Sequence, residues 1–321
     1  VTIDAGDDVR VSGELTGESV TVKTGNADTN TDDSYIAGAI DVADGGSGLT
    51  KQGSGTLKLT GDSTFTAKTH IEEGTLQIGD GGGTGSLASA NINIDDGATL
   101  DIQRNNEYTL ASNILDGTSS PSTGGAVTIN SDGGAITLSG ASDYSGGTTV
   151  TAGILKAGTD STVDTTTDPD TLTGGAFGTG LVTVNDGAEL DLNGAIVGND
   201  LSLTGTGVNG GALNHSGTAK ATVTGDITLA GAETVIKSLG DLDLTGAFNP
   251  PSGGSSLTLT FDNVGDIRIA DDLALTVDTT IKSATTEAGE DTGALILAGS
   301  IESATSTLRT LTIDNQGESI T

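Results

Sequence analysis

Apolar and polar residues alternate along most of this chain with a period of two, the pattern of a β-strand with one buried face. In the segment Thr-Leu-Lys-Leu-Thr at 56–60, the leucines face one side and the polar residues the other. Helical periodicity is almost absent, so the pattern predicts an all-β chain of short strands, each about 4–6 residues long. Such strands are predicted at residues 56–60, 75–78, 91–94, 99–102, 181–184, 189–192, 241–244 and 256–260.

Short clusters of Gly, Asn, Asp and Ser separate the alternating segments. These residues favour turns, because glycine adopts positive φ and the short polar side chains bond to nearby backbone. Turns are predicted at residues 95–97, 131–134 and 185–187.

The chain repeats itself. Residues 55–79 align without a gap to residues 134–158, and glycine and aliphatic positions coincide throughout. Residues 94–102 align in the same way to residues 184–192, but at a larger offset. The extra residues fall in the polar stretch 160–173, which contains Pro169, so this stretch is predicted to be a surface loop inserted in the second copy.

A repeat of several short strands without a helix favours coils of about 20–25 residues that stack on one another. A β-sandwich is the alternative, but it needs long-range antiparallel pairing. We predict an all-β parallel β-helix, or β-solenoid, built from internal repeats. Residues 1–245 are expected to form this solenoid, with two clear repeat copies at about 36–117 and 113–205, and residues 246–321 are expected to continue it in a more divergent form.

The aligned residues resemble a known family. Gly53–Gly61, Phe65 and Thr69–Gly79, with a second copy at Gly134–Gly158, are similar to the autotransporter-associated β-strand repeat. Residues 205–235 are similar to related repeats of very large bacterial surface proteins, and residues 250–321 match only loosely. The resemblance implies a right-handed parallel β-helix that is secreted across a Gram-negative outer membrane or held on the cell surface. It carries over no catalytic residue, because the family has none in common.

Composition narrows the possible functions. Asp and Glu number 44 against 12 Lys and Arg, for a net charge of −32, which argues against contacts with nucleic-acid phosphates or an anionic membrane. The chain has no Cys, so disulfides and thiolate chemistry are excluded. No apolar stretch approaches the roughly 20 residues of a membrane helix, so no membrane insertion is expected.

No constellation of residues predicts catalysis, and no catalytic, cofactor-binding or metal-binding residue is assigned. His70 and His215 lack metal-ligand spacing, and His70 is expected to point outward as a surface residue. Asp95, Asp96 and Asp186 are expected to shape turns rather than act as an acid pair. The few aromatic residues are expected to pack in the core or at coil edges.

Calcium is the one ligand that the acidic turns suggest, because carboxylates of successive coils can offer oxygen ligands. The calcium-binding nonapeptide is absent, since Thr50 and Leu87 stand where it needs Asp. No cofactor is therefore predicted, although weak calcium binding is kept as an expectation.

These observations favour a non-catalytic structural segment of an extracellular fibre, stalk or adhesin. Both ends of the sequence lack a capping segment, so we expect continuation in a longer chain or end-to-end self-association into filaments. Two alternatives stay open. One is a carbohydrate- or ion-binding surface module with a glycan or cell-surface ligand, and the other is a β-helix polysaccharide lyase or hydrolase.

Overall fold

The computed structural model describes residues 1–5, 8–25, 34–43, 45–117, 124–166, 171–251, 256–284, 293–303 and 309–315. Across these ranges the regular structure is β-strand, and the strands that pair between coils are parallel, which confirms the all-β parallel β-helix. The chain divides into two compact units. Unit 1 comprises residues 1–149 and 173–180, and unit 2 comprises residues 150–172 and 181–321.

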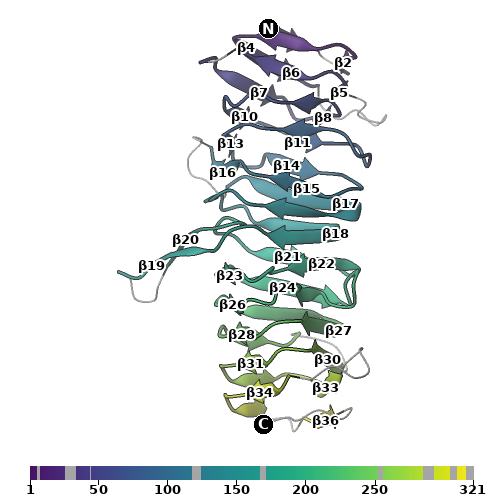
Figure 1. The fold of residues 1–321 in the computed structure, drawn as a ribbon, viewed down its shortest axis with the longest axis vertical. Coiled ribbons are helices and arrows are strands. Elements are labelled where there is room, and N and C mark those ends of the chain that lie inside the picture. Colours follow the sequence, from purple (N-terminus) through teal and green to yellow (C-terminus); the bar gives the residue numbers. More distant parts are fainter. Residues whose placement is uncertain are drawn as a thin grey trace. The chain divides into compact units, whose positions relative to one another are not determined.

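The coils of unit 1 have three sides, two of which are continuous parallel sheets and the third a set of short strand pairs. Figure 1 shows these strands stacked from purple to teal. The first sheet contains β1 (Thr2–Asp4), β4 (Ser19–Lys23), β7 (Gly48–Gln52), β10 (Thr69–Ile71), β13 (Asn91–Ile94) and β16 (Asn113–Asp116). The second contains β2 (Arg10–Val11), β5 (Tyr35–Ile36), β8 (Thr56–Leu59), β11 (Thr75–Ile78), β14 (Thr99–Ile102) and the first half of β17 (Ala126–Leu138). Short pairs make the third: β3 (Leu15–Gly17) with β6 (Ile40–Val42), β9 (Asp62–Ser63) with β12 (Ser86–Leu87), and β15 (Tyr108–Leu110) with the second half of β17.

Unit 2 has the same three-sided plan. β18 (Thr148–Ala157) enters it from unit 1. One column contains β21 (Val182–Val184), β24 (Leu201–Gly205), the first half of β27 (Ile227–Ser238), β29 (Phe248–Asn249), β32 (Leu273–Leu275) and β35 (Ile301–Ser303). The next contains β18, β22 (Ala188–Asp191), β25 (Leu213–His215), the second half of β27, β30 (Ser256–Asn263), β33 (Asp278–Ala284) and β36 (Leu311–Asn315). The third contains β23 (Ile196–Val197), β26 (Ala221–Val223), β28 (Leu242–Leu244), β31 (Ile267–Ile269) and β34 (Leu295–Leu297).

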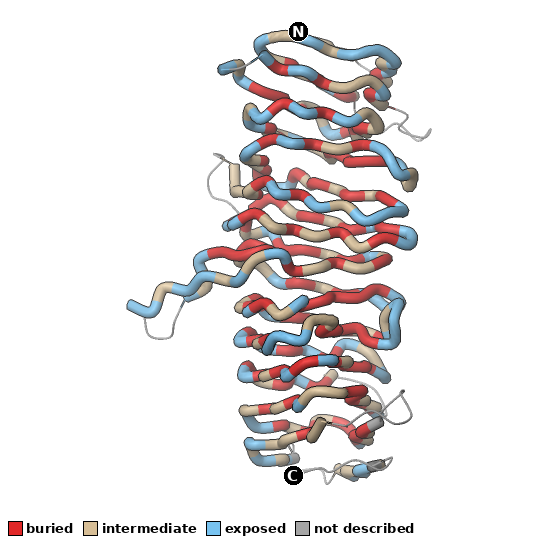
Figure 2. Tube along the Cα trace, in the orientation of Figure 1, coloured by how far each residue is buried: buried red, intermediate tan, exposed pale blue. Residues whose placement is uncertain are grey.

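The core of each unit is a set of apolar ladders. Register pairs Leu57 with Leu76, Leu76 with Leu100 and Leu100 with Val127, so one inward position stays aliphatic over four coils. All four side chains are buried, and Figure 2 shows buried positions alternating with less buried ones along the strands. Full burial of each such side chain contributes about 1.5–3 kcal/mol. The apolar residues of the period-two pattern are therefore the ones whose side chains point into the core.

Glycine is abundant because coils meet closely at their corners. A side chain at Gly265 would place its Cβ 2.3 Å from the backbone carbon of Gly240, and one at Gly293 would lie 2.2 Å from that of Gly265. These glycines occupy the same corner of successive coils. Any larger residue there would push two coils apart.

Two local predictions are wrong. Residues 131–134 were expected to form a turn, but they lie inside β17, where Gly133 bends the strand at a φ of +108° without interrupting it. The stretch 160–173 was expected to be a loop, but β19 (Thr162–Asp164) and β20 (Thr171–Gly174) form a two-stranded sheet there. Pro169 lies outside the described residues. The predicted turns at 95–97 and 185–187 are present, and each closes with a 3.0 Å backbone bond.

Candidate functional site

A buried group of polar side chains in unit 2 departs from the alternating pattern. All four residues of β22 are buried, although Glu189 and Asp191 occupy outward positions of the strand. Glu189 is 1% exposed and Asp191 is 4% exposed. The segment after β24 contacts Glu189 through Asn209, and the segment after β25 contacts Asp191 through Ser216. Buried carboxylates require hydrogen-bonding partners, so the partners show what these residues do.

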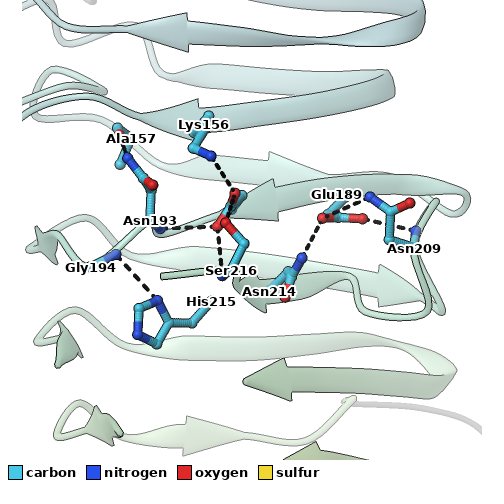
Figure 3. Close-up of polar contacts among 10 residues, drawn as sticks. Lys156, Ala157, Glu189, Asn193, Gly194, Asn209, Asn214, His215 and Ser216 are labelled. Atoms are coloured by element: carbon cyan, nitrogen blue, oxygen red, sulfur yellow. Dashed lines mark hydrogen bonds and ion pairs between the residues drawn. The ribbon is translucent and has the colours of Figure 1, made fainter. Parts of the chain in front are cut away.

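Glu189 fastens its own coil to the next one. Its Oε1 accepts a 2.7 Å hydrogen bond from the side-chain amide of Asn214, which lies on β25. Its Oε2 accepts the backbone N–H of Asn209 at 2.9 Å, in the segment that precedes β25 (Figure 3). Glu189 therefore holds a surface segment against the strand and bridges two coils.

Asp191 makes a parallel set of contacts one step along the strand. Oδ1 accepts the backbone N–H of Asn193 at 2.9 Å and that of Ser216 at 3.1 Å. Oδ2 accepts the Ser216 hydroxyl at 2.6 Å and lies 3.3 Å from Nζ of Lys156 in the preceding coil (Figure 3). One carboxylate thus joins three successive coils.

His215 is fully buried beside this group. Its Nδ1 accepts the backbone N–H of Gly194 at 3.2 Å, so that nitrogen carries no proton. Its Nε2 therefore carries the proton and donates to the carbonyl of Ala219 at 2.6 Å. Burial lowers the pKa of the imidazole from 6.5, against the opposing effects of the Ala219 carbonyl and two aspartates. The ring is a neutral bridge between coils rather than a free base.

Charged residues alternate along the outward column that contains Asp191. The register runs from Lys156 through Asp191, Asn214 and Lys237 to Asp262. Ion pairs join Lys156 to Asp191 at 3.3 Å and Lys237 to Asp262 at 3.6 Å. Opposite charges in neighbouring coils stabilise stacking in register, and like charges would oppose it.

Aspartates at the corners of unit 2 provide a second bridging device. Oδ1 of Asp241 accepts the backbone N–H of Asp266 at 3.1 Å, and Oδ1 of Asp266 accepts that of Ala294 at 2.8 Å. Asp200 and Asp226 are linked in the same way. Each carboxylate satisfies a backbone donor of the following coil, so the acidic corners are structural.

Unit 1 contains a buried cation with the same function. Lys51 occupies an inward position of β7, in register with Val22 and Ile71, and is fully buried. Its Nζ donates to the carbonyl oxygens of Gln52, Gly53 and Glu73, at 3.1, 2.6 and 3.0 Å. Glu73 belongs to the next coil, so this ammonium also joins coils.

Neither the Glu189–Asp191 group nor the bridging role of Lys51 was predicted from the sequence. For the corner aspartates a signal was present, because Gly-Asp recurs at 240–241 and 265–266, at the same corner of successive coils. For the buried side chains the signal was weak, since Glu189 and Asp191 fit the polar half of a strand pattern. Only the fold shows that a covering segment buries them.

The histidine at position 70 lies on the outward face of β10 but is not a free surface residue. Its Nε2 lies 2.9 Å from Oδ1 of Asp95, and its Nδ1 lies 3.6 Å from Oε1 of Glu72. Asp96 and Asp186 take part in the predicted turns. Most aromatic side chains are buried as expected, namely Phe65, Tyr144, Phe177, Phe248 and Phe261.

The buried polar side chains of this group hold coils together, and their hydrogen-bonding groups are already used for that purpose. In Glu189 and Asp191 every carboxylate oxygen already accepts a hydrogen bond. Within the described ranges no three His, Asp or Glu residues converge as metal ligands. The described residues also include no helix long and apolar enough to cross a membrane.

Parallel coils bridged by side chains, with repeats that align without a gap, define a β-solenoid. The Passenger-associated-transport-repeat family matches residues 49–78 and 129–157, which lie in the two repeat copies. The adhesin BmaC autotransporter of Brucella suis biovar 1 (strain 1330) is 47% identical over 72 residues. That match covers 22% of this chain and 2% of the adhesin, so the chain corresponds to a small part of its relative. No solved structure matches.

Proposed function

We propose that this chain is a non-catalytic structural segment of a secreted surface adhesin, a stack of coils that carries or presents other parts of the protein outside the cell. The observation that supports this proposal is that the buried charged residues Glu189, Asp191 and Lys51 make hydrogen bonds to neighbouring coils. On each of the three sides of the stack, strands of successive coils also pair in parallel through backbone hydrogen bonds. The similarity to an autotransporter adhesin supports the surface location.

The charge distribution supports the same role. A net charge of −32 keeps a repetitive β-structure soluble and discourages pairing between the outer faces of different molecules. Two outward cations of unit 2, Lys156 and Lys237, lie beside carboxylates in register. Such an arrangement suits a passive scaffold exposed to water.

Surface display tests the proposal. The chain is fused to a translocator in a Gram-negative host, and its resistance to an external non-specific protease is measured on whole cells. Leu190→Asp places a charge at a fully buried position, and Thr183→Asp is its matched control on an outward position. We expect the parent chain and Thr183→Asp to be displayed and protected, and Leu190→Asp to be digested.

The non-catalytic part of the proposal has its own test. The purified chain is incubated with acidic and neutral polysaccharides, and chain length is followed by size-exclusion chromatography. Depolymerisation of any of them would contradict a purely structural role. In the display experiment, equal protease digestion of the parent chain, Leu190→Asp and Thr183→Asp would contradict the proposed scaffold role.

Self-association is part of the proposal as well. A stack that pairs coils through parallel ladders can extend by adding coils of another copy. Sedimentation velocity over a wide concentration range measures it. A single species at all concentrations would remove filament formation from the proposal.

A further inference from the structure

Three side chains of unit 1 form a column that differs from the other charged columns. Arg10 on β2, Tyr35 on β5 and Lys58 on β8 are in register on three successive coils, and these strands lie one below another in Figure 1. The residues that follow Tyr35 and Lys58, Ile36 and Leu59, are buried in the core. The column therefore lies on the outer face, with a spacing of about 4.8 Å between coils.

This column lines a surface hollow of about 560 Å³. A hollow of this volume accommodates a small ligand or one to three sugar rings. It combines two cationic side chains, a phenol ring, a hydroxyl, a methyl group and a carboxylate. Its lining residues are Arg10, Tyr35, Ala37, Lys58, Thr60 and Asp80.

Lys58 lacks the carboxylate partner that Lys156 and Lys237 have. Lys156 and Lys237 each lie beside an in-register aspartate, whereas the register neighbours of Lys58 are Tyr35 and Gln77. Neither the Lys58 ammonium nor the Tyr35 hydroxyl has a hydrogen-bond or ion-pair partner in the described part of the chain. In a chain with 44 acidic and only 12 basic residues, a cation left without a carboxylate is available for an anion from outside.

We infer that this hollow binds a saccharide that carries a carboxylate, such as a uronate or a sialate. The Lys58 ammonium binds the carboxylate, with Arg10 adding positive charge while it remains paired with Asp8 at 2.7 Å. The Tyr35 ring packs against the apolar face of a pyranose. This activity goes beyond the scaffold role and does not depend on it.

The acidic residue in the lining separates a saccharide from an acidic peptide. Asp80 would repel a second carboxylate, but its oxygens accept hydrogen bonds from sugar hydroxyls. Oδ1 of Asp80 already accepts the backbone N–H of Gly82 at 3.2 Å, which orients the group. Thr60 offers a hydroxyl on the same side of the column. One anionic group beside several hydroxyls is the composition of an acidic sugar.

Titration calorimetry on the full chain tests the inference. The probes are trigalacturonate and 3′-sialyllactose, with galactotriose and lactose as their neutral counterparts, and hexaglutamate as an acidic peptide. The variants are Lys58→Gln, Tyr35→Thr and Lys220→Gln. Lys220 is a matched control, because it carries the same charge, pairs with Asp243 at 2.6 Å and does not line the hollow.

We expect at least one acidic saccharide to bind and its neutral counterpart to bind at least ~10-fold more weakly. Lys58→Gln and Tyr35→Thr should each weaken binding by about 10-fold, and Lys220→Gln should leave it unchanged. Circular dichroism confirms that each variant is folded. Binding of neither acidic saccharide, equal binding of the neutral sugars, or equal loss in Lys220→Gln would overturn the inference. Preferential binding of hexaglutamate would overturn it in favour of a peptide ligand.

Discussion

At the scale of single residues, Asp101 is the carboxylate whose environment suits it least. It lies on β14 between Gln77 and Thr128 of the adjacent coils. Its Oδ1 is buried without a hydrogen-bond partner. Burial raises its pKa from 3.8 to about 6, because the charged form loses hydration that nothing in the fold replaces.

We predict that Asp101→Asn stabilises unit 1 at pH 7.5 by about 1–2 kcal/mol, after allowance for partial exposure. The folded state binds the proton more tightly than the unfolded state. Asp101 therefore costs nothing below pH 4, and the cost develops as the pH rises through 4 to 6. Urea unfolding of both proteins at pH 4 and pH 7.5 measures this. An equal gain at both pH values would contradict the assigned cause.

His215 has the opposite dependence on pH. Its lowered pKa means that the folded state holds the neutral ring, so stability falls as the pH drops below 6.5. We predict that His215→Phe removes this dependence and destabilises the chain by about 2–4 kcal/mol. The physical reason is that the Gly194 N–H and the Ala219 carbonyl lose their partner.

Nitrogen NMR of the imidazole provides an independent check on His215. The nitrogen-bound proton of the neutral ring should reside on Nε2, and the ring should become doubly protonated only at a pH below the 6.5 of a free imidazole. His70→Phe is the matched control, because that ring is partly exposed. A His215 ring that titrates at or above pH 6.5, or a larger loss of stability in the control, would contradict the prediction.

At the scale of elements, the alternation of apolar and polar residues was enough to locate strands. It did not predict where a strand bends between two sides of a coil or where its outward face is covered. β11, β13 and β14 begin and end where the pattern placed them, because one buried face per strand leaves a period of two in the sequence. β17 runs through a predicted turn, since Gly133 at positive φ bends it between two pairings: residues 126–129 pair with β14 and residues 136–138 pair with β15. Burial of the outward face of β22 depends on a covering segment, and strand periodicity carries no information about such a segment.

Strand orientation can be tested with a matched pair of truncations in unit 2. Leu190 is fully buried in register with Leu155 and Leu213, and Thr183 lies on the outward side of β21. We predict that Leu190→Ala destabilises the chain by about 2–5 kcal/mol and that Thr183→Ala changes stability by less than about 0.5 kcal/mol. Thermal unfolding followed by circular dichroism measures both. Similar effects would mean that the inward and outward faces are misassigned.

At the scale of the whole molecule, the sequence predicted the architecture and the family resemblance because the same residue pattern occurs in two copies, at 55–79 and 134–158. The same glycine and aliphatic positions recur in both copies, so the solenoid and the resemblance followed from alignment. The column of Arg10, Tyr35 and Lys58 is assembled from three coils, and the second repeat copy has Thr137 where the first has Lys58, so no repeat could reveal it. Single sites in a repetitive fold become visible only when the register is known.

The net charge of −32 makes a prediction for the entire chain. Repulsion among carboxylates opposes folding, and salt screens it over about 10 Å at 0.1 M. We expect the melting temperature to rise by several degrees between about 0.02 and about 0.3 M sodium chloride. Calcium chloride at matched ionic strength separates screening from binding, because specific sites add stability in proportion to their occupancy. Equal shifts in the two salts would contradict the expectation of calcium binding, whereas a larger shift in calcium that a chelator reverses would support it.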